Sequence, residues 1–216
     1  MQKLTFLIII LFCISVKSFS QTAMKVHNYY FYYDNKVTKP TMTISTMTKI
    51  HEKFYFSTYT IVRHSWGQCV LGFDVAATDW MILGFKAGIQ TETNGSMGRY
   101  SPIVYIQKNK WNIFGVYEWG GYRDRSQGML CYRLKNFNPG IMEAHNGDLV
   151  AIGPMLEYSI PKSVFTFYGS AMTVLKDGKF ASQFGLYIKF LPKESDKFEK
   201  METSMFYNMP DFRPIN

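Results

Sequence analysis

The residues that could carry out chemistry in this sequence are few and scattered. His64 or His145 could act as a base if Asp74, Asp79 or Asp148 and a serine lay beside it. No Gly-x-Ser-x-Gly motif occurs, and His145 stands in the turn-like stretch MEAHNGD. We therefore predict no catalytic residue, and the pattern does not favour an enzyme. A membrane-embedded, lipid-modifying enzyme remains as a second alternative.

The cysteines and histidines do not show the spacing of a metal site. Cys69 and Cys131 are isolated, and no ligand pattern joins them to the four histidines. No glycine-rich phosphate loop occurs either, so we expect no metal and no cofactor. Isolated cysteines on apolar segments are typical of buried thiols, although a disulfide between them is left open.

Five charged residues follow a structural pattern instead. They lie in segments where apolar and polar residues alternate, and each falls on the polar face, which carries few charges. These residues are Lys86, Arg99, Glu118, Glu157 and Lys189. Hairpin pairing places Arg99 opposite Glu118, and it places Glu157 and Lys189 two strands apart. We predict that these charges form an internal network that holds the register of a barrel.

The segments that must position these charges read as β-strands. Aromatic residues make up 17% of the chain, and apolar and polar residues alternate between short turns. We predict an all-β, antiparallel up-and-down transmembrane β-barrel of about 8–10 strands, with 10 favoured. The predicted strands are 41–50, 53–64, 68–76, 80–91, 98–107, 110–122, 127–134, 148–160, 163–175 and 179–190.

Pairing these strands through short turns tests the alternation. A turn at 108–109 places Tyr105 opposite Asn112. A turn at 161–162 places Tyr158 opposite Phe165, and the next hairpin places Phe165 opposite Phe190. Large apolar residues then share one face in each hairpin, and a slip of one residue would break this pattern.

Two features indicate that the apolar face points outward. The predicted strands are mostly 9–13 residues long, and a tilted membrane strand needs about 9–11. The polar face is rich in glycine, alanine and serine, which suits a crowded lumen better than a solvated surface. A soluble periplasmic, lipocalin-like barrel that binds a hydrophobic ligand is the first alternative.

The ends of the sequence read differently from its middle. Residues 1–20 have the basic start, short apolar core and small residues of a secretory signal peptide, with cleavage expected near Ser20/Gln21. We expect an N-terminal extension at 21–40, a barrel at 41–191 and a periplasmic tail at 192–216. The longest connection, 135–147, is expected to form an external loop.

The stretch QFGLYIKF carries a family resemblance. Its polar residue, glycine, hydrophobic residue and final aromatic are Gln183, Gly185, Ile188 and Phe190. This spacing resembles the closing-strand signal of bacterial outer-membrane β-barrel proteins, although here the chain continues beyond the aromatic residue. The resemblance implies an outer-membrane location, contact with outer-membrane lipid and recognition by the barrel-assembly machinery.

The composition further limits the classes of function that the protein could have. The net charge is +8, but no run of five like charges occurs, so the basic residues indicate a lipid-phosphate-facing rim and no nucleic-acid partner. A barrel of 8–10 strands has a lumen that side chains nearly fill. We therefore expect a structural or interaction role, or a small-ligand role. The oligomeric state is left open.

Overall fold

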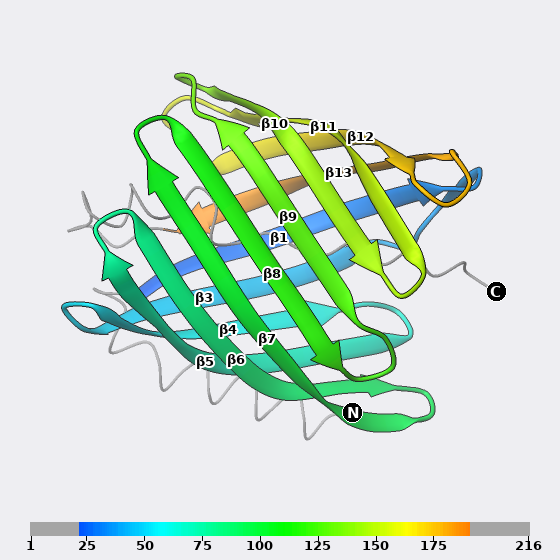
Figure 1. Cartoon of the computed structure of the whole chain (residues 1–216), viewed down its shortest axis with the longest axis horizontal. Helices are drawn as coiled ribbons and strands as arrows, with labels where there is room; N and C mark the ends of the chain where they lie inside the picture. The colour runs from blue at the N-terminus through cyan, green and yellow to red at the C-terminus, as the bar shows by residue number, and fades with distance from the viewer. Residues whose placement is uncertain (1–21, 191–216) are drawn as a thin grey trace.

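Twelve antiparallel strands follow one another in chain order around a closed barrel (Figure 1). The computed structural model describes residues 22–190, so the expected signal peptide and C-terminal tail lie outside the described residues. The last strand pairs with the first, which closes the sheet, while β2 pairs only with the end of β1. Within the described residues, no helix is long and apolar enough to cross a membrane. The strands are β1 (Thr22–Tyr33), β2 (Lys36–Val37), β3 (Thr41–His51), β4 (Phe54–Val62), β5 (Trp66–Thr78), β6 (Met81–Glu92), β7 (Gly95–Lys108), β8 (Trp111–Gly120), β9 (Arg125–Tyr132), β10 (Phe137–Asn146), β11 (Leu149–Ser159), β12 (Phe165–Val174) and β13 (Phe180–Phe190).

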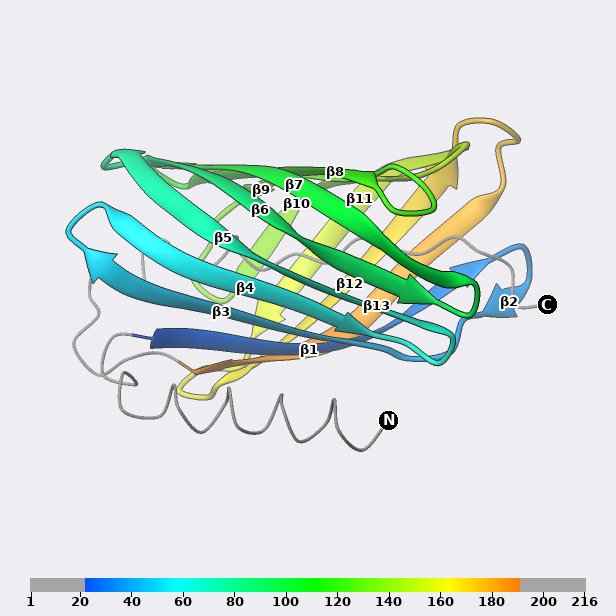
Figure 2. The ribbon, with the colours of Figure 1, turned by 90° about the horizontal axis from the view of Figure 1, so that it is seen from below.

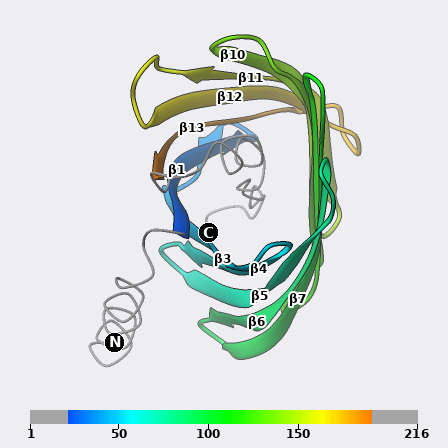
Figure 3. The same ribbon diagram turned by 90° about the vertical axis from the view of Figure 1, so that its left-hand side faces the viewer.

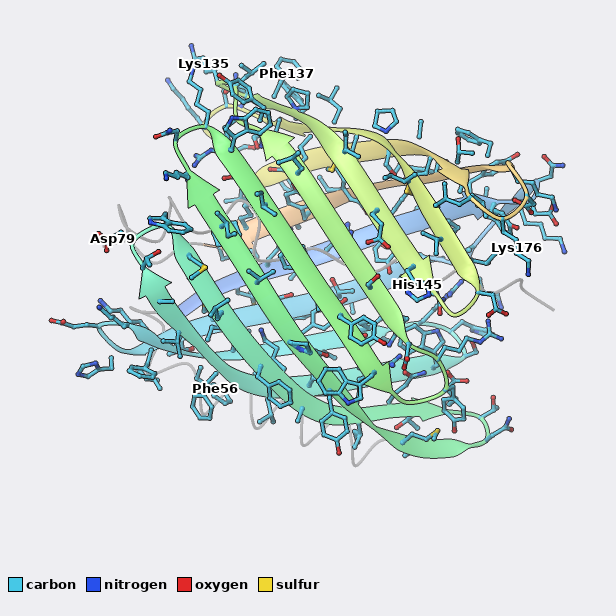
Figure 4. The ribbon with its side chains drawn as sticks, viewed as in Figure 1. Phe56, Asp79, Lys135, Phe137, His145 and Lys176 are labelled. Atoms are coloured by element: carbon cyan, nitrogen blue, oxygen red, sulfur yellow. The ribbon has the colours of Figure 1, made fainter. Side chains whose placement is uncertain are left out.

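The barrel is apolar outside and polar inside. Large hydrophobic side chains on the outer face are about half exposed, among them Phe73 at 56%, Phe85 at 49% and Phe167 at 49%. Figure 4 shows Phe56 and Phe137 pointing away from the barrel. An exposed apolar surface that runs around a whole barrel suits lipid and not water. The structure therefore argues against the soluble lipocalin-like alternative.

The two ends of the barrel carry the charged connections. Because the number of barrel strands is even, Thr22 at the start of β1 and Phe190 at the end of β13 lie at the same end (Figure 2). Asp79 and Lys135 lie in connections at this end, and Lys176 lies at the opposite end (Figure 4). The charges at these three connections border the apolar band on both sides.

The predicted faces are correct, but the predicted register is shifted by two residues in each tested hairpin. Tyr105 lies opposite Phe114 and not Asn112. Tyr158 lies opposite Phe167 and not Phe165, and Phe165 lies opposite Ile188 and not Phe190. A shift of two residues leaves every side chain on its predicted face. The predicted and the observed registers therefore both satisfy the alternation of apolar and polar residues.

Two strands were missed by the sequence analysis, which explains why it favoured ten. The segment 21–40, expected as an extension, contains β1, which pairs along its length with both β13 and β3. The segment 135–147, expected as an external loop, contains β10, which pairs with β9 and β11. The connection between β9 and β10 is short and lies at the end of the barrel that holds Thr22.

Candidate functional site: the polar lumen

Glu118 is the centre of a buried group of side chains in the lumen. Its carboxylate lies 3.1 Å from Arg125 Nη2 and 3.7 Å from Arg99 Nε. Gln68 Nε2 donates a hydrogen bond of 2.7 Å to Glu118 Oε1, and Ser101 Oγ donates one of 3.1 Å to the same oxygen. All five side chains are buried. We call these residues, Gln68, Arg99, Ser101, Glu118 and Arg125, the lumen charge cluster.

The two arginines of this cluster also bind the wall around it. Arg99 Nη1 donates to the backbone oxygens of Gly120 and, at 2.6 Å, of Arg123. Arg125 donates to Gln90 Oε1 at 3.3 Å, and its guanidinium carbon lies 4.7 Å from the ring centre of Trp66. These contacts come from β5 to β9, so the cluster ties together neighbouring strands of one wall.

Arg125 is a member of the cluster that the sequence analysis missed. It lies directly opposite Glu118 in the pairing of β8 with β9. Arg99, the predicted partner, lies opposite Gly120 and reaches Glu118 diagonally. The predicted strand began at Gln127, which left Arg125 in a loop.

Lys86 belongs to a second buried ion pair. Its Nζ lies 3.2 Å from Asp74 Oδ1, and both side chains are buried. Gly84 lies opposite Asp74, and a side chain on Gly84 would overlap the Asp74 carboxylate. The glycine therefore provides the space into which Asp74 turns to meet Lys86.

Glu157 and Lys189 meet through a tyrosine between them. Tyr187 Oη donates a hydrogen bond to Glu157, and the Lys189 ammonium lies 5.1 Å from the centre of the Tyr187 ring. Asn138 Nδ2 donates to the second oxygen of Glu157 at 3.0 Å. Lys25 lies closer to the same ring, at 3.7 Å. The structure therefore separates the predicted charges into three groups, around Glu118, Asp74 and Glu157.

An aromatic group on β1, β12 and β13 surrounds His27. The ring stacks on Tyr29 with centroids 4.8 Å apart and meets the edges of Tyr168 and Tyr187 at 4.9 and 5.6 Å. Among residues 22–190, neither ring nitrogen of His27 has a hydrogen-bond partner, and the buried hydroxyl of Tyr59 has none either. Buried polar atoms of this kind usually meet water or a solute.

A cavity borders the lumen charge cluster. Its volume is ≈ 40 Å³, and Ser57, Asp74, Lys86, Ser101 and Glu118 are among its lining residues. A buried water needs about 10–15 Å³ measured in this way, so the cavity has room for about three waters. The lumen therefore has a small wettable space beside the ion pairs.

The residues of the closing-strand signal lie on β13. Gln183 is buried in the lumen and donates a hydrogen bond of 2.6 Å to Tyr168 Oη. A side chain on Gly185 would come within 2.8 Å of atoms of both Tyr29 and Tyr168, so tyrosine packing requires glycine there. Ile188 and Phe190 alternate with these lumen residues and lie on the outer face.

The residues considered for catalysis do not share a site. His64 lies in the connection before β5, and Asp79 lies in the connection after it, at the other end of the barrel. Asp74 is buried in the lumen, whereas His145 alternates with the buried Ala144 of β10 and points to the opposite face. Asp148 is exposed in the next connection. In residues 22–190, no group of three histidine, cysteine or carboxylate residues could hold a metal ion.

A closed antiparallel barrel with an apolar exterior and a charged interior is the architecture of small bacterial outer-membrane β-barrel proteins. No protein-family model and no curated protein matches the sequence. Solved structures do match. The NanC porin has a TM-score of 0.55 and 11% identity, with 77% of this chain and 100% of that chain covered. The KdgM porin has a TM-score of 0.56 and 10% identity, with 77% and 99% covered. A chain from work on in-meso crystallization of membrane proteins has a TM-score of 0.59 and 8% identity, with 78% and 83% covered. The likeness is one of fold.

Proposed function

We propose that the protein is an outer-membrane barrel whose lumen offers small polar solutes a narrow path. The observation that supports this most directly is the cavity beside the lumen charge cluster, where buried polar atoms line wettable space. The two porins of similar fold agree with a channel role. Twelve strands lie between the filled lumens of about 8 strands and the open pores of about 16.

The buried charges would make this path selective for ions of one sign. The buried ionic side chains of residues 22–190 comprise four cations and three carboxylates, an excess of one positive charge. The cations are Lys25, Lys86, Arg99 and Arg125, and the carboxylates are Asp74, Glu118 and Glu157. A narrow polar path with low-dielectric walls amplifies such an imbalance. We expect small anions to pass more readily than small cations.

A second candidate is a closed barrel with a structural role. The near-complete burial of Arg99 and Glu118, each 1% exposed, favours it. In this case the lumen charge cluster would seal the barrel and stabilise its register, and no solute would pass.

Conductance across a planar lipid bilayer separates the two candidates. The parent chain should show small, anion-selective steps. Arg125→Ala should enlarge them, because it removes a large side chain from the lumen charge cluster. The control is Arg133→Ala, in the connection between β9 and β10, which should conduct like the parent. Silence of both the parent and Arg125→Ala would contradict the channel and favour the closed barrel.

Partners follow from the same proposal. The outer face would contact outer-membrane lipid, and β13 would be the strand that the barrel-assembly machinery recognises. Phe190→Ala leaves the lumen unchanged because the side chain is on the outer face. We expect this variant to accumulate unassembled in cells while it still folds in detergent. Normal assembly of Phe190→Ala would argue against recognition of this strand.

A further inference from the structure

Sulfur-bearing side chains gather on one wall of the lumen. Five of them on β9 to β12 are each no more than 4% exposed and belong to one core cluster. These side chains form an apolar patch in a lumen whose face on the same strands also carries Arg125, Asn138 and Glu157. We call the five sulfur-bearing residues the sulfur cluster: Met129, Cys131, Met142, Met155 and Met172.

Two atoms of the sulfur cluster meet across an intervening strand. Cys131 Sγ lies 3.7 Å from Met155 Sδ, although β10 separates their strands. Gly140 of β10 pairs with both residues, and a Cβ there would come within 2.7 Å of Cys131 Sγ. Side chains two strands apart start about 10 Å from each other. The glycine therefore provides the space in which the two sulfurs approach.

The other methionines repeat this arrangement one row along the barrel. Met142 lies opposite Met129 on one side and opposite Gly153 on the other. A Cβ on Gly153 would come within 2.6 Å of the Met172 Cα. Gly153 thus allows the backbone of β12 to approach β11 closely between Met142 and Met172.

We propose that the sulfur cluster binds a soft monovalent cation of the Cu(I) class, with Cys131 Sγ and Met155 Sδ as ligands. Thiolate and thioether sulfur are the ligands that select Cu(I). Two sulfurs 3.7 Å apart fit one edge of a tetrahedron with metal–sulfur distances of about 2.3 Å. Met129, Met142 and Met172 belong to the same core cluster and are the candidates for the further thioethers that such a site needs.

Binding of a monovalent ion by the Cys131 thiolate is balanced in charge and in atoms. Binding displaces the thiol proton to solvent, so that Cys131–SH and Cu⁺ give Cys131–S–Cu and H⁺ with no change of oxidation state. The Cys131–S–Cu unit is itself neutral. Thioether ligands also distinguish this ion from a divalent ion such as Zn²⁺, which cysteine, histidine and carboxylate ligands hold. The proposal does not depend on whether the barrel conducts.

The test is Cu(I) binding by the folded, detergent-solubilised chain under anaerobic conditions, in competition with a chromophoric Cu(I) chelator. The parent should bind one ion. Cys131→Ser and Met155→Leu should each weaken binding by at least about tenfold. Two matched controls should bind like the parent: Cys69→Ser, which changes the exposed cysteine, and Met47→Leu, which changes a buried methionine in a separate cluster.

Met155→Leu keeps the volume of the side chain, so its folding should be preserved, and a retained shift in gel mobility on heating checks this. X-ray absorption of the loaded parent should show sulfur neighbours only. The site is refuted if the folded parent binds no Cu(I), if folded Met155→Leu binds as tightly as the parent, or if Cys69→Ser abolishes binding. The last result would assign the metal to the outer surface.

Discussion

Removing the Glu118 carboxylate should be the most damaging single change in the lumen charge cluster. Glu118→Ala leaves Arg99 and Arg125 buried without a counter-charge, and Gln68 and Ser101 each lose an acceptor. Breaking a buried ion pair by removing one partner costs about 3–5 kcal/mol. Arg99→Ala should cost less, about 1.5–3 kcal/mol, because Glu118 keeps its other three partners.

The assay is reversible unfolding of the detergent-solubilised barrel in guanidinium chloride, followed by tryptophan fluorescence. With a slope of about 4 kcal/mol per M, a loss of 3–5 kcal/mol lowers the midpoint by about 1 M. The double variant Glu118→Ala/Arg125→Ala should unfold at higher denaturant than the sum of its single changes predicts, because no unpaired charge remains on that pair.

Glu52→Ala is the matched control, because Glu52 is an exposed glutamate in the connection between β3 and β4. Its midpoint should equal that of the parent. If water solvated the lumen charge cluster, each ion pair would contribute only about 0–1 kcal/mol. Equal midpoints for Glu118→Ala, Arg99→Ala and the parent would therefore refute the reasoning.

Three further outcomes follow from the structure. The barrel should migrate differently on a gel before and after boiling, and a mobility unaffected by boiling would argue against a closed barrel. A membrane-permeant maleimide should label Cys69 in the folded protein and reach Cys131 only after denaturation, whereas equal labelling would contradict their different burial. The backbone N–H of Lys179 donates a hydrogen bond to the Asp177 carboxylate and holds the pKa of that group below its ordinary 3.8. This hydrogen bond orders the β12–β13 turn. The order is present above pH 3.8 and is lost as the pH falls through the lowered pKa. A carboxyl NMR titration of Asp177 measures this, and a midpoint at or above 3.8 would contradict it.

Alternation of apolar and polar residues predicted the faces of the strands because burial acts on every second side chain. It could not predict register, because a shift of two residues preserves every face. The turns decide between the registers. In the structure the β7–β8 turn is Asn109 and Lys110, and Asn109 adopts a φ of 57°. The prediction had put this turn one residue earlier, which shifted the pairing by two.

The site was predicted only where strand bounds were nearly right. Arg99, Glu118 and Lys86 were assigned to the lumen because their strands were recognised over most of their length. Arg125 was missed because it is the first residue of β9. Asp74 was considered only as a catalytic partner, since a carboxylate that turns into the space over a glycine on the next strand leaves no signal within its own strand.

β10 was not predicted from the sequence because part of its lumen face is apolar. Its lumen face carries Met142 and Ala144, while Glu143 stands on the opposite face and accepts a hydrogen bond of 3.2 Å from Ser126. Over these residues the usual pattern of a membrane strand, apolar outside and polar inside, is reversed. Figure 3 shows β10 and β11 across the barrel from β3 to β5, which carry polar lumen residues. The lumen thus has a sulfur-bearing wall facing a hydrogen-bonding wall. Leucine has nearly the volume of methionine, so simultaneous Met→Leu replacement in the sulfur cluster should leave stability nearly unchanged. Cu(I) binding should be lost in the same variant, because the thioether ligands are gone. Unchanged Cu(I) binding by this folded variant would show that the methionines only fill space.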